Sequence, residues 1–187
     1  MGQQTPFLRD LKVKQRYLVS LNRRRIQGST FFGFVVDYSD MLVLLHSFNS
    51  TAFCLTGYEV VRQKDIDSYC FFDDPRYWRV RAMRRLKIKP VKPSGISLCS
   101  IRDLLASLTG KYPLIGVGSE RAVGKSVEFV GPIVSMAERT FKIEDSDYFG
   151  RWTGPHRMKY DEVTNVCFDD GYLRASALTH AKWKRKH

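Results

Sequence analysis

The motif "CFFDD" (Cys70–Asp74) recurs almost unchanged as "CFDD" (Cys167–Asp170), and this repetition decides the fold that the sequence predicts. The two copies lie about half a chain length apart in 187 residues. Three further pairs of segments resemble each other in the same order and at similar spacing. We therefore predict that the chain contains two copies of one structural unit.

The further pairs lie upstream of the two motifs and share their pattern of apolar and charged residues. First copy against second, they are Asp65-Ile66 and Glu162-Val163, "GFVVDYSDMLVLL" (Gly33–Leu45) and "GPIVSMAERTFKIE" (Gly131–Glu144), and "YLVSLN" (Tyr17–Asn22) and "PLIGVG" (Pro113–Gly118). The long pair is typical of two strands joined by a tight polar turn. Within the opening motifs, we expect Phe71 and Phe168 to point inward.

A short amphipathic segment precedes each copy, at residues 7–12 and 100–108. In the second segment, the apolar residues Ile101, Leu104, Leu105 and Leu108 have the spacing of one helix face. Each copy then contains four or five short β-rich segments, too few for a sandwich but enough for a small closed barrel. The predicted fold is mainly β, with two small SH3-like β-barrels in tandem, each preceded by a short α-helix.

A short helix followed by five bent strands resembles the Sm-like family, which includes the LSm proteins and the bacterial chaperone Hfq. "GFVVDYSDMLVLL" resembles the first Sm motif and "VVRQKDI" (Val60–Ile66) resembles the second. Family members that bind uridine use Asp and Asn of the first motif and Arg and Gly of the second. Those positions are here Asp37, Leu42, Arg62 and Gln63, so the Asn and the Gly are replaced.

The resemblance covers about residues 5–72 and implies Sm-like barrels, which join edge to edge through their fourth and fifth strands. We place the first barrel, with its helix and a basic extension, at residues 1–88, and the second at 96–180. Residues 89–95, "KPVKPSG", contain two prolines and a glycine and are assigned as a linker. Residues 181–187 form a basic tail.

The net charge of +12 points to a polyanionic partner. Residues 76–92, "RYWRVRAMRRLKIKPVK", contain eight Lys and Arg and no acidic residue. As an extended strand, this segment would present one basic and one apolar face. Basic side chains attract phosphates, and neighbouring aromatic rings stack on unpaired bases.

The sequence thus predicts a non-catalytic nucleic-acid-binding protein whose partner is RNA rather than DNA. The predicted binding residues are Arg23, Arg24, Arg25, Arg62, Tyr77, Trp78, Arg79, Arg81, Arg84, Arg85, Lys87 and Lys89. The alternative is a protein-interaction module that assembles with itself or with other proteins through its barrel edge strands. An acidic protein would also be attracted to the same basic face.

No set of residues is arranged as a catalytic or metal site. The segment 116–126 resembles a phosphate-binding loop but has Ser119 where the leading Gly belongs. The four cysteines form no CxxC pair, and "EDSD" (Glu144–Asp147) lacks a calcium-loop pattern. We expect no enzyme activity, no cofactor and no metal. Without a signal peptide or a long apolar run, we expect a cytoplasmic protein with no membrane partner.

Overall fold

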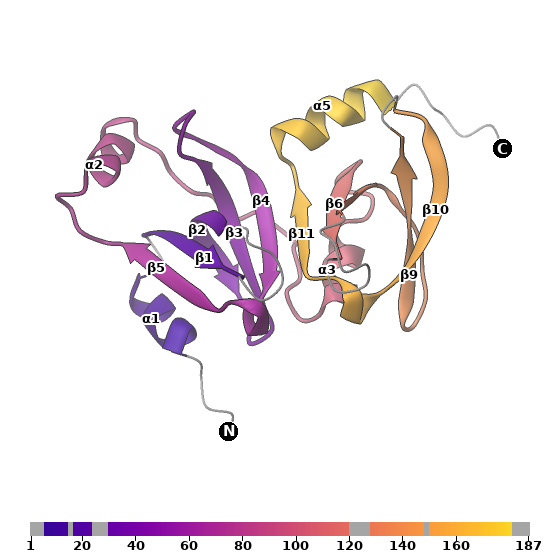
Figure 1. The fold of residues 1–187 in the computed structure, drawn as a ribbon, viewed down its shortest axis with the longest axis horizontal. Helices are drawn as coiled ribbons and strands as arrows, with labels where there is room; N and C mark the ends of the chain where they lie inside the picture. The colour runs from indigo at the N-terminus through magenta and orange to yellow at the C-terminus, as the bar shows by residue number, and fades with distance from the viewer. Residues whose placement is uncertain (1–5, 15–16, 24–29, 120–127, 148–149, 181–187) are drawn as a thin grey trace.

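The computed structural model describes residues 6–14, 17–23, 30–119, 128–147 and 150–180. Within them the fold is mainly β, as predicted, with antiparallel strands in two sheets. The larger sheet has the strand order β5-β1-β2-β3-β4-β11-β6-β7, and the smaller one has the order β10-β9-β8. Figure 1 shows the two halves of the chain side by side, with β4 of the first half next to β11 of the second.

The elements of the first half are α1 (Pro6–Lys14), β1 (Leu18–Asn22), β2 (Thr30–Tyr38), β3 (Leu42–Asn49), β4 (Cys54–Arg62), the 3-10 turn η1 (Gln63–Asp65), β5 (Ser68–Phe72) and α2 (Trp78–Arg85). Those of the second half are α3 (Ile101–Leu108), β6 (Ile115–Gly118), β7 (Glu128–Gly131), β8 (Ile133–Met136), β9 (Thr140–Ser146), β10 (Trp152–Lys159), η2 (Tyr160–Glu162), β11 (Asn165–Phe168) and α5 (Gly171–His180).

The order of elements is the same in both halves. A helix leads to strands, then to a 3-10 turn, a short strand and a final helix. Pro132 separates β7 from β8, so that these two strands stand where the first half has the single strand β2. Ile66 and Val163 follow the two 3-10 turns. Ile66 packs against a core cluster of the first half, whereas Val163 is buried in a cluster to which both halves contribute. Phe168 is buried and Phe71 is half-buried, both against core residues, as expected.

The predicted closure of each half into a barrel is wrong for the described strands. In the first half, β5 pairs with β1, but the outer edge of β4 pairs with β11 instead of returning to β5. The ladder joins Tyr58 to Phe168 and Val60 to Val166. The backbone groups at the outer edge of β4 therefore bond to the other half of the chain. The first half does not have to close into a barrel to pair this edge.

A row of four aromatic side chains crosses this junction. His46, Tyr58, Phe168 and Tyr112 follow one another with ring centroids 4.5, 5.1 and 4.9 Å apart. Gly57 lies beside this row with a φ of +120°, and a Cβ there would come within 2.6 Å of the Asp170 backbone. Glycine is required at position 57 because the second half approaches the backbone so closely.

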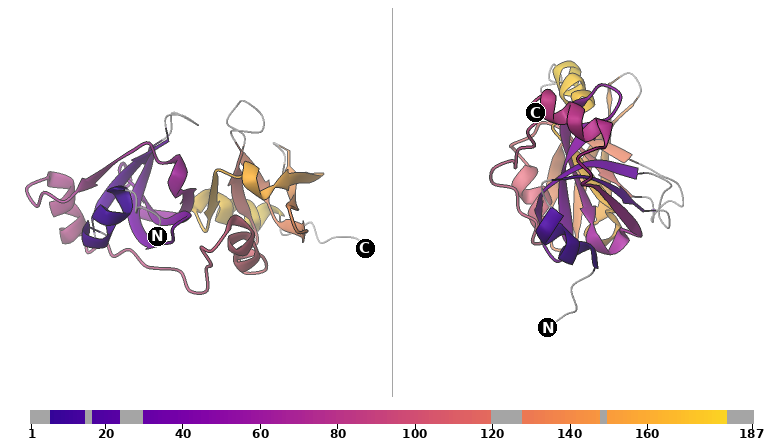
Figure 2. Two further views of the ribbon diagram at one scale, coloured as in Figure 1. Left: turned by 90° about the horizontal axis from the view of Figure 1, so that it is seen from below. Right: turned by 90° about the vertical axis from the view of Figure 1, so that its left-hand side faces the viewer.

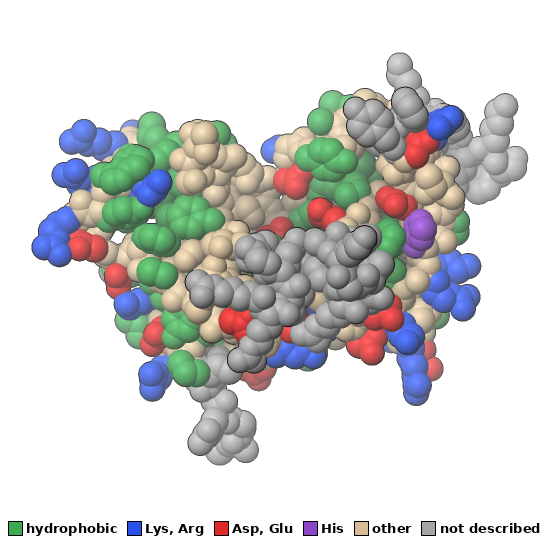
Figure 3. Space-filling view, in the orientation of Figure 1, with side chains coloured by type: hydrophobic (Ala, Val, Ile, Leu, Met, Phe, Trp, Pro, Cys, Tyr) green, Lys and Arg blue, Asp and Glu red, His purple; other side chains and the backbone are tan. Residues whose placement is uncertain are grey.

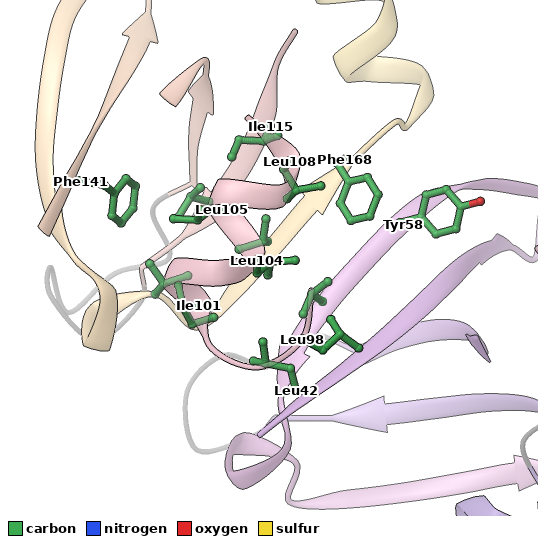
Figure 4. Packing of buried hydrophobic residues seen from close by; sticks show 14 of the residues in the cluster. Leu42, Tyr58, Leu98, Ile101, Leu104, Leu105, Leu108, Ile115, Phe141 and Phe168 are labelled. Carbon is green, nitrogen blue, oxygen red and sulfur yellow. The ribbon is translucent and has the colours of Figure 1, made fainter. Parts of the chain in front are cut away.

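The helix α3 builds one hydrophobic core from both halves (Figure 4). Ser100 caps the helix by accepting a hydrogen bond from the Asp103 N–H at 3.1 Å, and Ser is among the residues favoured at a helix N-cap. The four apolar residues of the helix are buried against strands of the second half. They belong to the same core cluster as four residues of the first half, Leu42, Leu44, Tyr58 and Val60. This shared core makes the two halves one packing unit.

Two buried arginines add directed polar contacts to the junction. Arg62 donates to the carbonyl oxygens of Asp161 at 2.7 Å and of Tyr160 at 2.5 Å. Arg23 donates to the carbonyl oxygen of Thr164 at 3.0 Å. Each guanidinium thus links the first half to the second. Its hydrogen bonds to carbonyl oxygens take the place of the bonds to water that are lost on burial.

The connector between α2 and α3 is fastened to the first half. Figure 2 shows it running along one side of the molecule. The Val91 N–H donates to Nδ1 of His46 at 3.0 Å, and Lys92 pairs with Asp37 at 2.8 Å. The Ser39 hydroxyl donates to the Leu98 carbonyl oxygen at 2.8 Å. The connector therefore contributes to the junction in addition to linking the halves.

The shared core predicts that the two halves unfold together. Replacing Leu104 with Ala leaves a cavity in this core and should lower the free energy of unfolding by about 2–5 kcal/mol. Urea titration followed by circular dichroism should still give one transition, at a lower midpoint. Ala106→Ser, on the exposed face of the same helix, is the control with a small effect. A second transition in the Leu104→Ala protein would show that the halves are separate folding units.

A partly buried carboxyl at the junction predicts pH-dependent stability. Glu59 accepts a hydrogen bond from the Asn165 amide at 2.7 Å, and burial raises the pKa of Glu59 from 4.5 to about 8. The folded state therefore holds a proton that the unfolded state releases above pH 4.5. The free energy of unfolding falls as pH rises towards 8, by at most about 1.4 kcal/mol per pH unit.

Glu59→Gln keeps the oxygen acceptor and removes the ionisation. We expect the variant to be more stable than the parent at pH 8.5, with a smaller difference between pH 5.5 and pH 8.5, in urea denaturation at both pH values. Glu138→Gln, at an exposed glutamate before β9, should follow the parent. An unchanged pH dependence in Glu59→Gln would mean that Glu59 ionises normally in the folded protein.

Candidate nucleic-acid interface

Residues 78–85 form the helix α2 at the end of the first half that lies away from the junction (Figure 1). The prediction of an extended strand here is wrong. Val80 and Met83 are three residues apart, and as a helix they bury one face against Leu18, Phe34 and Phe48. The alternation of basic and apolar residues fitted a strand, but this hydrophobic contact selects the helix.

The end of α2 is shaped to keep its basic residues in solvent. Lys87 has a φ of +53°, and the Ile88 N–H returns to the Met83 carbonyl oxygen at 3.1 Å, which closes the last turn. Arg84 and Arg85 lie in that turn, where cations interact favourably with the helix dipole. The turn then directs the chain into the connector.

Five cations on and after α2 are exposed and carry no ion pair within the described part of the chain. They are Arg81, Arg84, Arg85, Lys87 and Lys89. Figure 3 shows Lys and Arg side chains gathered at this end of the molecule, beside hydrophobic side chains of the first half. Unpaired cations at one end leave a local positive potential that attracts polyanions.

Six aromatic side chains surround the start of α2 in a closed circuit of contacts, which we call the aromatic cluster. In order, they are Phe32, Phe48, Phe53, Trp78, Tyr77 and Phe72, with neighbouring centroids 5.4 to 6.5 Å apart. Trp78 is 52% exposed, whereas Phe48 is buried. The cluster thus anchors α2 and also presents aromatic surface next to its cations.

Arg79 joins the cations to the aromatic cluster. Its guanidinium lies 4.7 Å from the Trp78 ring centroid and 5.7 Å from that of Tyr77, and it donates a hydrogen bond to the Tyr77 hydroxyl. Such cation–π contacts orient the guanidinium without neutralising it. Arg79 therefore keeps its positive charge beside an exposed ring.

Other predicted binding residues lie elsewhere. Arg23 and Arg62 are buried at the junction and hydrogen-bonded there, so they are not part of an exposed interface. Burial follows from the pairing of β4 with β11, which a search for charged clusters does not consider. Arg24 and Arg25 lie outside the described residues.

The positions that match the Sm motifs are only partly brought together. Leu42, Arg62 and Gln63 line a cavity of about 510 Å³ at the junction, together with residues of η2 and the start of α3. Asp37 instead pairs with Lys92 of the connector. Because Arg62 donates to two carbonyl oxygens, its guanidinium is held in place in the cavity wall.

The structure adds Phe32, Phe53 and Phe72 to the candidate interface, which the sequence-based prediction missed. Phe53 comes from the turn between β3 and β4, while Phe32 and Phe72 come from β2 and β5. The density of Phe in "STFFGF" and "CFFDD" was the available signal. It did not show which rings meet, because the contacts join residues distant in sequence.

The remaining sequence motifs are described only in part. Asp147 of "EDSD" pairs with Arg151 at 2.7 Å. Among the described residues, no three His, Cys, Asp or Glu side chains are arranged to hold a metal ion. Within the same ranges, every helix is too short or too polar to cross a membrane. Residues 116–118 are strand β6, and residues 120–127 of the loop-like motif lie outside the described residues.

Comparisons with protein families, with curated proteins and with solved structures gave no match to this chain.

Proposed function

We propose that this chain is a non-catalytic nucleic-acid-binding protein that contacts phosphates through α2 and the start of the connector. The observation that carries this proposal is the set of five exposed cations on and after α2 that have no ion pair among the described residues, on the same segment as the half-exposed Trp78. Phosphate contacts of this kind release counterions, and adjacent rings accept bases. The preference for RNA over DNA follows the resemblance of residues 5–72 to the Sm-like family.

The finer description of the fold belongs to the same proposal: the two halves are tandem Sm-like units. It is supported by the common order of elements and by glycines at corresponding places. Gly57 and Gly154 stand equally far before η1 and η2, with φ values of +120° and +105°. Fold alone assigns no activity, so the functional proposal depends on the α2 surface.

A salt series of RNA-binding measurements tests the functional proposal. We expect the affinity for a single-stranded RNA to fall with salt concentration in the parent protein. Replacing Arg81, Arg84 and Arg85 with Ala should weaken binding roughly tenfold or more at low salt and reduce the slope of log K against log salt by about 2.

The matched control replaces Arg102, Arg139 and Lys142 with Ala, which removes equal charge from the second half. This variant should keep most of the affinity. Absent binding, binding that is insensitive to salt, or equal losses in both variants would contradict a specific role of α2.

The pairing of β4 with β11 favours a second candidate function, assembly with further copies of the chain. Among the described strands, β5 pairs only with β1, and β10 pairs only with β9. A Cβ at Gly154 would meet nothing within 4 Å, whereas the corresponding Gly57 is covered by the Asp170 backbone. Arg157 and Lys159 make the β10 edge basic, and Lys159 pairs with Glu162 at 3.7 Å within the chain. Asp73 follows β5 and pairs with Lys14 at 2.5 Å.

Light scattering coupled to size exclusion tests assembly. We expect a mass of at least two chains of 21.7 kDa each. The double variant Arg157→Asp with Lys159→Asp should have the mass of a single chain. Pro155 lacks a backbone donor at this edge, so the pairing should be weak and best seen at high protein concentration. Arg139→Asp is the control. A single-chain mass at every concentration would refute this candidate.

A further inference from the structure

An open hollow of about 600 Å³ lies between the end of β5 and the start of α2, next to the proposed phosphate-binding surface. Its aromatic walls are Phe71, Phe72, Tyr77 and Trp78. This volume is within the range of about 300–1,000 Å³ that is typical of small-molecule sites. The hollow is large enough for a planar heterocycle.

The rings of the hollow are fixed in position but keep accessible surface. Phe72 and Tyr77 stack at 5.5 Å with an interplanar angle of 22°, and Trp78 is tilted by 55° from Tyr77. Phe53 stacks on Trp78 at 5.7 Å and supports it from the β3–β4 turn. Trp78 is still 52% exposed, so part of this side chain remains accessible to a ligand.

The charges around the hollow favour a ligand that carries phosphate. Both of its carboxylates are already paired: Asp73 with Lys14 at 2.5 Å, and Asp74 with Arg76 at 2.8 Å. These hydrogen bonds lower the pKa of each carboxyl, so both acids remain ionised and matched by a cation. A cationic ligand would have to displace Lys14 or Arg76, whereas a phosphate meets Arg79 and the unpaired cations of α2.

We propose that this hollow holds one unpaired base of a single-stranded nucleic acid, with the adjoining phosphates on the cations of α2. This inference rests on the proposed function and deepens it, because it assigns single-stranded nucleic acid as the ligand class. A base inside a duplex is stacked and paired and does not reach the rings. Stacking on aromatic side chains accepts every base, so the site selects an unpaired base rather than a sequence.

The experiment compares one RNA sequence as a single strand and as a duplex. Trp152→Phe with Trp183→Phe leaves Trp78 as the only tryptophan, and Trp183 lies outside the described residues. We expect the single strand to quench the fluorescence of Trp78 and the duplex to leave it unchanged. In the otherwise unaltered chain, Trp78→Ala should weaken single-strand binding by roughly 5- to 150-fold, with the duplex affinity and the salt slope unchanged.

Two further variants separate stacking from folding. Trp78→Phe keeps an aromatic ring and should retain most of the single-strand affinity. Leu86→Ala, at an exposed apolar residue beyond α2 and outside the hollow, should bind as the parent does. Thermal unfolding of Trp78→Ala checks that the protein as a whole remains folded, and a loss of duplex binding in this variant would overturn the proposal.

The failure of this inference differs from the failure of the proposed function. Equal affinity for single strand and duplex, with no quenching of Trp78, overturns the base site and leaves the phosphate surface in place. No binding of either RNA overturns both proposals. If choline quenches the fluorescence of Trp78 and added RNA does not reverse this quenching, the hollow binds a methylated cation. That result would overturn the base site.

Discussion

The antiparallel pairing of β4 with β11 is the constraint on which the rest of the structure depends. It joins the two halves through main-chain hydrogen bonds and determines which side chains lie between them. The core around α3, the row of aromatic rings and the contacts of Arg23 and Arg62 all form at this ladder. A hydrophobic core and a hydrogen-bonded strand edge thus stabilise the same interface, so neither half has to close on itself.

The junction also explains where the candidate interface lies. Arg23 and Arg62 are buried where the two halves pack together, whereas α2 lies at the opposite end of the first half. Val80, Met83 and the aromatic cluster attach one side of the helix, which leaves Arg81, Arg84 and Arg85 exposed. Accumulating unpaired cations at one place costs repulsion, and a polyanionic partner offsets that repulsion on binding.

Much of the local structure could be predicted because local physics determines it. The start of α1 at Pro6 and the Ser100 cap of α3 follow from residues within a few positions of each other. The candidate site was predicted less well. Tyr77, Trp78 and the basic residues after them were placed in the interface, but as a strand, because alternation over so few residues also suits a helix that has one buried face.

By itself, the sequence determined a mainly β chain of two similarly ordered halves, the capped start of α3 and the strongly basic segment after "CFFDD". Only the tertiary structure decided that β4 takes β11 as its partner, that two of the predicted binding arginines are buried, and that residues 78–85 are helical. The physical reason is that these outcomes depend on contacts between residues far apart in the chain. Such contacts compete for the same strand edges and apolar surfaces, and no local pattern records which of them prevails.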